Sequence, residues 1–325
     1  MGRTLRREAK RLGAACGLAA LPLLSACEAP LELDAVDAVT AAPVRRTDAF
    51  GAIARTRTRT YVAGGSVILS RTDPGDPWRR ERLAANGPVA ITDLAACPDG
   101  RVVGADFYRA VWTRSPDTEW HRHAVPTQEH LLGVACDAGG VTVVGAFSTL
   151  MTSGDLSDWT DASPGEDAIL NAVATDDRGA LAVGEFGYVA RRGADGAWGG
   201  DYVLPDEFFA YDVADGPAGL IVTGLGGRVL RSGDGGASWS AVPSEVPAPL
   251  YAVAPSGGGA LAVGAGGAVV SIDAGAARVL TRVPAPDLRA VMPMGADAAL
   301  VAGRGHLGTV DLNQDAGRTR DGGAS

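Results

Sequence analysis

The stretch "IVTGLGGRVLRSGDGGASW", from Ile221 to Trp239, contains the pattern that decides the fold of this chain. An apolar segment ends in glycine and is followed by a glycine turn, a second apolar segment and a polar turn that ends at a tryptophan. A similar unit, "LAVGEFGYVARRGADGAW", runs from Leu181 to Trp198. Short apolar segments separated by Gly and Asp predict β-strands joined by tight turns. The repeat therefore predicts an all-β protein.

Two series of residues give the period of this repeat. The glycines that end one strand of each unit are 39 to 41 residues apart, and the tryptophans are 39 to 42 apart. These residues are Gly64, Gly104, Gly145, Gly184, Gly224, Gly264 and Gly303, and Trp78, Trp120, Trp159, Trp198 and Trp239. A period near 40 residues is typical of a propeller blade. We predict a seven-bladed β-propeller over residues 47–312, and six or eight blades are the open alternatives.

The last unit is short of one strand. It has three strands and then runs into the polar segment "NQDAGRTRDGGAS", residues 313–325, which we expect to be a disordered tail. A strand from residues 34–44 is a candidate for the missing outer strand, because it would cover the exposed edge of the last blade. The alternative is that residues 27–46 are only a linker.

The N-terminus has the features of an export signal over residues 1–26. A basic segment precedes a short apolar one, and "LSAC", from Leu24 to Cys27, follows directly. This sequence resembles the bacterial lipobox, which implies cleavage before Cys27 and lipidation of that cysteine. Glu28 after it favours the outer membrane. We expect a protein anchored by lipid to the bacterial outer membrane or to the periplasmic side of the inner membrane; a plain secretory signal or a short anchor helix are the alternatives.

Charge excludes one class of partner. Without residues 1–26 the chain has 24 arginines, no lysine and 37 acidic residues, so its formal net charge is −13. Nucleic-acid binding needs a concentrated basic surface, which this composition does not supply. We therefore expect protein partners at a membrane surface and a monomer without a small-molecule cofactor.

The opening stretch also contains a turn motif. Ser232, Asp234, Gly236 and Trp239 fit S-x-D-x-G-x-x-W, the Asp-box of bacterial neuraminidase-type, sortilin-like repeats, and 271–275 repeats part of it. The aspartate of such a turn accepts backbone hydrogen bonds, glycine permits a positive φ, and tryptophan packs under the turn. We interpret the motif as structural, on the outer edge of a blade.

Seven such units behind a lipobox resemble the photosystem II stability/assembly factor family. The likeness covers about Asp48 to Leu312 and is clearest in the two units quoted above. It implies a seven-bladed, non-enzymatic assembly factor at a membrane surface. The acidic mature chain and its lack of lysine point away from a photosynthetic role.

Two cysteines occupy the same position in neighbouring units. Cys97 and Cys136 each follow an expected innermost strand. Inner strands lie closest together near a propeller axis, so their Cα atoms can approach the separation that a disulfide requires. An exported protein meets an oxidising compartment. We predict a disulfide; two free buried thiols are the alternative.

One position of the expected innermost strands varies in chemistry while its neighbours stay apolar. We call the residues at this position the channel ring: Gly51, Asp93, Leu132, Asn171, Tyr211, Tyr251 and Arg289. Variable polar and aromatic side chains on a repeated scaffold are typical of recognition sites. Asp93, Asn171, Tyr211, Tyr251 and Arg289 are therefore the candidate binding residues, unless they only line a water-filled channel.

Catalytic chemistry has weaker signals. Sialidases need an arginine triad and a Tyr–Glu pair, and the R-[IV]-P sequence at 282–284 lies far from its usual place near the start of such a domain. A lectin would repeat aromatic platforms in each blade. His121 and His123, with His130 nearby, have a spacing suited to a metal but more simply form a solvated strand face. We expect a non-catalytic protein-binding scaffold without a metal; a sialidase-like hydrolase or glycan-binding lectin is the alternative.

Overall fold

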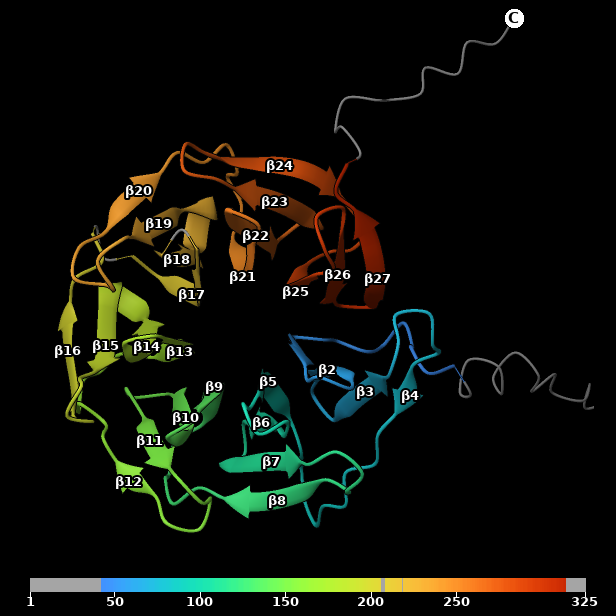
Figure 1. The fold of residues 1–325 in the computed structure, drawn as a ribbon, viewed down its shortest axis with the longest axis vertical. Coiled ribbons are helices and arrows are strands. Elements are labelled where there is room, and N and C mark those ends of the chain that lie inside the picture. The colour runs from blue at the N-terminus through green and yellow to red at the C-terminus, as the bar shows by residue number, and fades with distance from the viewer. Residues whose placement is uncertain (1–41, 206–207, 218, 314–325) are drawn as a thin grey trace, which may run out of the picture. The chain divides into compact units, whose positions relative to one another are not determined.

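The computed structural model describes residues 42–205, 208–217 and 219–313, which form a seven-bladed β-propeller (Figure 1). Seven antiparallel sheets surround a central axis, and the first strand of each sheet lies nearest to that axis. The predicted fold and blade count are confirmed. The export signal, Cys27, residues 34–41 of the candidate closing strand and the tail from residue 314 lie outside the described residues. Residues 42–44 are not in a strand.

Each blade is built from consecutive strands, from the axis outward. Blades 1 to 3 are β1 (Ala52–Arg55), β2 (Thr60–Gly64), β3 (Val67–Arg71), β4 (Arg79–Arg80); β5 (Ile91–Ala96), β6 (Val102–Asp106), β7 (Ala110–Arg114), β8 (His121–Ala124); and β9 (Leu131–Asp137), β10 (Gly140–Gly145), β11 (Leu150–Ser153), β12 (Thr160–Asp161). Blades 4 and 5 are β13 (Leu170–Asp176), β14 (Gly179–Gly184), β15 (Tyr188–Arg192), β16 (Trp198–Tyr202); and β17 (Ala210–Gly216), β18 (Gly219–Gly224), β19 (Val229–Ser232), β20 (Ser240–Val242). Blades 6 and 7 are β21 (Leu250–Ser256), β22 (Gly259–Gly264), β23 (Ala268–Ile272), β24 (Ala277–Arg282); and β25 (Leu288–Pro293), β26 (Ala298–Gly303), β27 (His306–Asp311). Among the described residues, no helix is long and apolar enough to cross a membrane.

The core lies between neighbouring blades. The second strands are buried along almost their whole length, as in β14 and β22. Ile221 of blade 5 and Val270 of blade 6, for example, belong to one buried cluster. Strands buried on both faces are continuously apolar, which explains why these segments show no alternation of polar and apolar residues. Each fully buried Val or Leu contributes about 1.5–3 kcal/mol, so blade-to-blade packing holds the ring together.

Glycine ends most second strands because the backbone comes very close there. A Cβ atom on Gly184 would lie 1.9 Å from the carbonyl oxygen of Ile169, and one on Gly145 would lie 1.9 Å from that of His130. No side chain fits at such a distance. This close approach is the physical cause of the glycine period in the sequence.

Blade 2 departs from this rule, and the prediction that Gly104 ends its second strand is wrong. β6 continues to Asp106, which pairs with Ile91 as the strand-end glycines of other blades pair with their inner strands. The buried Asp106 carboxylate accepts hydrogen bonds from the Ala90 N–H at 3.1 Å and from Trp112 Nε1 at 2.9 Å. A hydrogen-bonded aspartate thus replaces glycine in this blade.

Backbone contacts between the first and last blades close the ring. Ala49 forms an antiparallel bridge with Arg304, and the Gly305 N–H donates to the Asp48 carbonyl at 2.7 Å. The buried Asp48 carboxylate pairs with Arg80 of blade 1. In Figure 1, β27 accordingly lies beside the first blade. These bonds close the ring within the described residues, where blade 7 has three strands.

A disulfide links the inner strands of blades 2 and 3. Cys97 directly follows β5, Cys136 lies in β9, and their Cα atoms are 5.0 Å apart. Both side chains lie in the apolar cluster between these blades. The bond therefore joins two sheets that are already packed together.

Replacing both cysteines by alanine is expected to destabilise the propeller without changing its fold. The bond closes a loop of 39 residues, for which the loss of chain entropy is worth about 4 kcal/mol. Thermal unfolding measures this loss, and reductant should lower the Tm of the wild type but not of the double variant. Peptide mapping without reductant should recover the two cysteine peptides linked; free, alkylated peptides would contradict the assignment.

Candidate functional site

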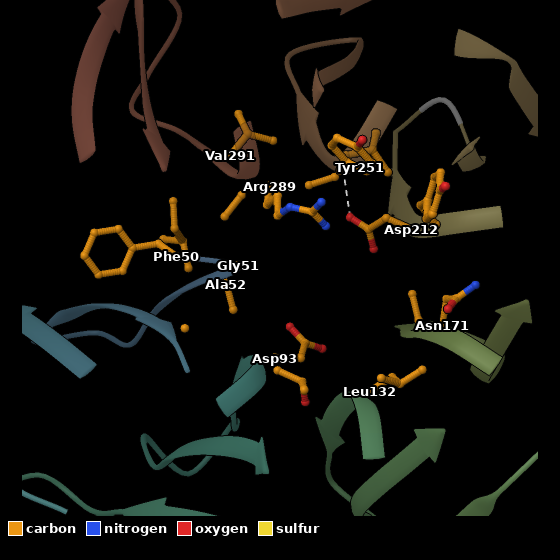
Figure 2. Close-up of a pocket in the computed structure, with 18 of the residues that line it drawn as sticks. Phe50, Gly51, Ala52, Asp93, Leu132, Asn171, Asp212, Tyr251, Arg289 and Val291 are labelled. Carbon is orange, nitrogen blue, oxygen red and sulfur yellow. Dashed lines mark hydrogen bonds between the residues drawn. The ribbon is translucent and has the colours of Figure 1, made fainter. Parts of the chain in front are cut away.

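A cavity of about 510 Å³ lies on the propeller axis, and all seven channel-ring residues line it (Figure 2). Figure 2 shows the Asp93, Asp212 and Arg289 side chains pointing into the central space. The grouping of the ring residues around one cavity agrees with the sequence prediction. Whether they bind a partner is a separate question.

β-Bulges in the inner strands present the channel ring. In blade 5, Ala210 pairs with Gly224 and Asp212 pairs with Thr223, so Tyr211 has no cross-strand partner. The same register shift leaves these ring residues unpaired: Leu132, Asn171, Tyr251 and Arg289. A bulge re-aims a side chain locally without ending the strand. Here it provides the same projecting position in successive blades.

In blade 2 the predicted channel-ring position is wrong by one residue. The residue skipped in β5 is Thr92, whose hydroxyl bonds to the carbonyls of Ala105 and Leu131 at 3.2 Å. Asp93 lies one residue further along the strand and is in register with Asp212. The sequence prediction did not include Asp212 among the site residues. The signal was present, because "TDLA" at 92–95 aligns with "YDVA" at 211–214.

An aromatic and cationic cluster covers the wall formed by blades 5 to 7. The rings of Tyr211 and Tyr251 meet edge to face with centres 5.3 Å apart, and the Arg289 guanidinium lies 4.3 Å from the centre of the Tyr251 ring. Phe209 extends the cluster, with its ring centre 5.2 Å from that of Tyr211. The exposed Arg289 also lies 3.6 Å from the Asp287 carboxylate. Cation–π contact with Tyr251 holds Arg289 against the aromatic wall, while the side chain stays exposed to a ligand.

The opposite wall is less available for recognition. Asn171 uses one of its two Nδ2 hydrogens to donate to the Ala210 carbonyl at 2.7 Å, which joins blade 4 to blade 5. Leu132 and Gly51 have no polar side-chain group. Apart from the Asp93 carboxylate, the polar chemistry of the ring is therefore concentrated in Tyr211, Tyr251 and Arg289.

Two half-buried aspartates, Asp93 and Asp212, lie between this cavity and a second one of about 240 Å³, since both residues line both cavities. Asp93 accepts a hydrogen bond from the Val134 N–H of blade 3 at 2.9 Å. Asp212 accepts one from the Val253 N–H of blade 6 at 2.8 Å. Each carboxylate also accepts from the N–H of the residue that follows it. The aspartates thus tie together the inner strands of adjacent blades.

Burial changes the protonation of both acids. It raises the pKa of Asp93 to about 6 and that of Asp212 to about 7, although the backbone hydrogen bonds oppose this rise. The Asp93 carboxylate raises the pKa of Asp212 further. The pair therefore titrates near neutral pH, and the neutral acid is the form that burial favours.

The Asp-box turn lies on the outer edge of blade 5, between β19 and β20. Ser232 donates to Asp234 at 2.7 Å and accepts from the Gly236 N–H at 2.8 Å, while Trp239 Nε1 donates to the Gly236 carbonyl at 3.0 Å. None of these residues lines the axial cavity. The contacts are those of a turn that supports its own blade.

The same turn recurs where the sequence motif was not recognised. Ser153 and Asp155 of blade 3 repeat the serine–aspartate hydrogen bond, and the Leu156 N–H donates to Ser153 as the Gly236 N–H does to Ser232. Ser271 of blade 6 does not hold the position of Ser232 in blade 5. Ser232 pairs with Leu220 of the second strand, and the residue with the corresponding pairing in blade 6 is Ile272, which pairs with Ala260. The partial motif at 271–275 is one residue out of register.

Other candidate sites remain apart from the cavity. Within residues 42–205, 208–217 and 219–313, no three His, Cys, Asp or Glu side chains are placed to hold a metal. His121 and His123 lie on the outer strand β8, where His123 bonds to the Thr113 hydroxyl at 2.9 Å, and His130 stacks on Phe107. Arg282 belongs to the outer strand β24.

The chain matches no protein-family profile and no curated protein sequence. Solved structures share its fold. A catalytically inactive histidine-to-alanine variant of virginiamycin B lyase from Staphylococcus aureus with quinupristin has a TM-score of 0.71 at 10% identity, over 81% of this chain and 94% of that one. YCF48 from Cyanidioschyzon merolae has a TM-score of 0.64 at 13% identity, over 84% and 98%. YCF48 bound to D1 peptide has a TM-score of 0.63 at 13% identity, over 79% and 91%. The chain is therefore similar in fold to both an enzyme and an assembly factor.

Stability is expected to depend on pH through Asp93 and Asp212. Their raised pKa values mean that their contribution is fully present below about pH 4 and is lost as the pH rises through about 6 and 7. Replacing Asp93 by asparagine should flatten the dependence of Tm on pH between about pH 4 and pH 6, the interval between its unfolded and folded pKa values. Asp177→Asn, at an exposed site, is the control. An unchanged slope in the Asp93 variant would contradict the assignment.

The two serine motifs should respond differently to substitution. Ser232→Ala leaves the Gly236 N–H without its acceptor and removes a bond to Asp234, so we expect a loss of about 1–2 kcal/mol. Ser271→Ala removes only a long contact of 3.5 Å and should be nearly neutral. Chemical denaturation measures the free energy of unfolding of the two variants. Equal losses would contradict the conclusion that only Ser232 holds the Asp-box position.

Proposed function

We propose that this protein is a non-catalytic scaffold that binds an extended segment of a partner protein at the channel ring. The observation that carries the proposal is the cluster of Tyr211, Tyr251 and Arg289 on the wall of the axial cavity. Tyr and Arg are among the side chains most enriched in the energetic centres of protein interfaces. A cluster already held in place loses little conformational freedom on binding.

The similarity to YCF48 bound to D1 peptide supports this proposal, because a propeller of the same fold takes a peptide ligand. The identity of 13% is too low to transfer the ligand itself. The cavity of about 510 Å³ has room for a few peptide side chains but not for a folded domain. Segments of the partner outside the cavity would lie over the surrounding face.

The cavity chemistry supports binding more than catalysis. The inactive lyase variant carries alanine in place of a histidine, and no histidine lines this cavity within the described residues. A sialidase-type site needs three arginines and a glutamate, whereas the described lining has Arg289 and Arg304 and no glutamate. Asp93 and Asp212 are each occupied with two backbone N–H groups.

The location of this scaffold is proposed from the sequence. The lipobox-like segment from Leu24 to Cys27 supports a lipid anchor on the extracytoplasmic side of a bacterial membrane. A tethered propeller would meet partners that lie in or on the same membrane. The acidic mature chain supports a protein partner over a nucleic acid.

Selection of a displayed random-peptide library on the purified full-length chain tests the proposal. Peptides that are enriched should bind Tyr251→Ala and Arg289→Ala about tenfold more weakly, as expected for residues at the centre of an interface. Arg278→Ala, an exposed arginine on outer strand β24, is the matched control and should bind normally. No enrichment above an empty surface, or cleavage of a sialoside or of quinupristin by the chain, would overturn the proposal.

A further inference from the structure

Exposed apolar side chains gather on one set of turns. They follow the second strand of four consecutive blades, and each is 40% to 61% exposed. We call them the apolar arc: Tyr108, Phe147, Phe186 and Leu225, in blades 2, 3, 4 and 5. Single exposed apolar residues need no explanation, but the same turn in four neighbouring blades makes a continuous feature.

The arc lies over blades 2 to 5, on the face of the propeller whose turns reach the axial cavity. The equivalent turns of blades 1 and 7 contain Gly65 and Arg304, and both residues line the axial cavity. Antiparallel strands alternate in direction, so these turns and the connections between blades share one face. A ligand at the channel ring therefore extends naturally over the arc.

The arc is costly for the fold. Phe147 and Phe186 have left-handed backbones with φ of 49° and 55°, at the position where the next two blades have Gly226 and Gly266, with φ of 68° and 64°. Glycine adopts this conformation freely, whereas a bulky side chain there costs about 1 kcal/mol or more. With 61% and 51% of these residues exposed, burial offsets little of that cost. Folding does not explain two phenylalanines here.

Acidic side chains border the arc. Asp167 and Glu245 are exposed on the connections between blades, and Glu129 and Glu185 lie beside the turns. Three arginines lie nearby: Arg109 donates to Gln128 at 3.1 Å, Arg122 donates to the Tyr108 carbonyl at 3.3 Å, and Arg228 packs over the Phe208 ring at 5.0 Å. The four acids outnumber these arginines, so the net charge around the arc is negative, which attracts cations and repels anionic lipid headgroups.

We infer that the apolar arc binds a polypeptide segment that presents apolar side chains between lysines or arginines. The apolar side chains would cover Phe147 and Phe186, and the basic ones would meet the acidic border. This inference rests on the proposed function and states the chemistry of the partner. Charge complementarity distinguishes this partner from an anionic membrane.

The test uses fluorescence anisotropy with the full-length chain and labelled synthetic peptides. One peptide carries leucine and phenylalanine between lysines, a second has glutamate in place of lysine, and a third has serine in place of the apolar residues. Only the first should bind, and added salt should weaken it. The double variant Phe147→Gly, Phe186→Gly should bind it about tenfold more weakly. The Tm of this variant should stay equal or rise, because glycine relieves the left-handed backbone.

Asp117→Gly is the matched control. Asp117 also has a left-handed backbone, with φ of 60°, but lies in the turn between β7 and β8 on the opposite face. This variant should gain similar backbone relief and bind the peptide normally. Equal binding of lysine and glutamate peptides, full binding by the phenylalanine variant, or a preference for phosphatidylglycerol vesicles would overturn the inference. If library peptides need Tyr251 but not the arc, the inference fails while the proposed function stands.

Discussion

The close backbone approach at the end of each second strand is the constraint on which the rest of this propeller depends. In six blades the second strand ends at a glycine. A Cβ atom on that glycine would lie only 1.9–2.1 Å from a carbonyl oxygen that precedes the inner strand. Only glycine is compatible with that contact. In five of these blades the second residue of the inner strand is skipped in the register and lines the axial cavity. The glycine series and the channel ring are two consequences of one geometry.

This geometry separates stability from recognition. The apolar clusters between blades hold the sheets, while the bulge residue has no cross-strand partner and is free to vary. Tyr211, Tyr251 and Arg289 use that freedom to build one wall of the cavity. Asp93 and Asp212 each follow the skipped residue of their strand and accept hydrogen bonds from the adjacent blade. Loss of solvation raises their pKa values and so opposes their ionisation.

One face of the molecule combines two kinds of surface. The cavity wall is aromatic and cationic, whereas the arc of Phe147 and Phe186 is aromatic with an acidic border. A partner that engages both must place different chemistry at its ends: carboxylate or carbonyl groups for Arg289, and lysine or arginine near the arc. Such a mixed requirement would give specificity that neither surface has alone.

The sequence by itself determined the architecture, because a repeat records the same local contact in six of the seven blades. It predicted the blades, the proximity of Cys97 and Cys136, and most of the channel ring. The tertiary structure decided what depends on register and exposure. Gly104 matches the glycine period but lies two residues before the strand end. In the same blade Thr92 holds the register position of Tyr211, and Asp93 holds that of Asp212. The exposure of Phe147 and Phe186 was equally hidden, since the sequence does not say whether neighbouring segments cover an apolar turn residue, and the folded ring leaves both in solvent.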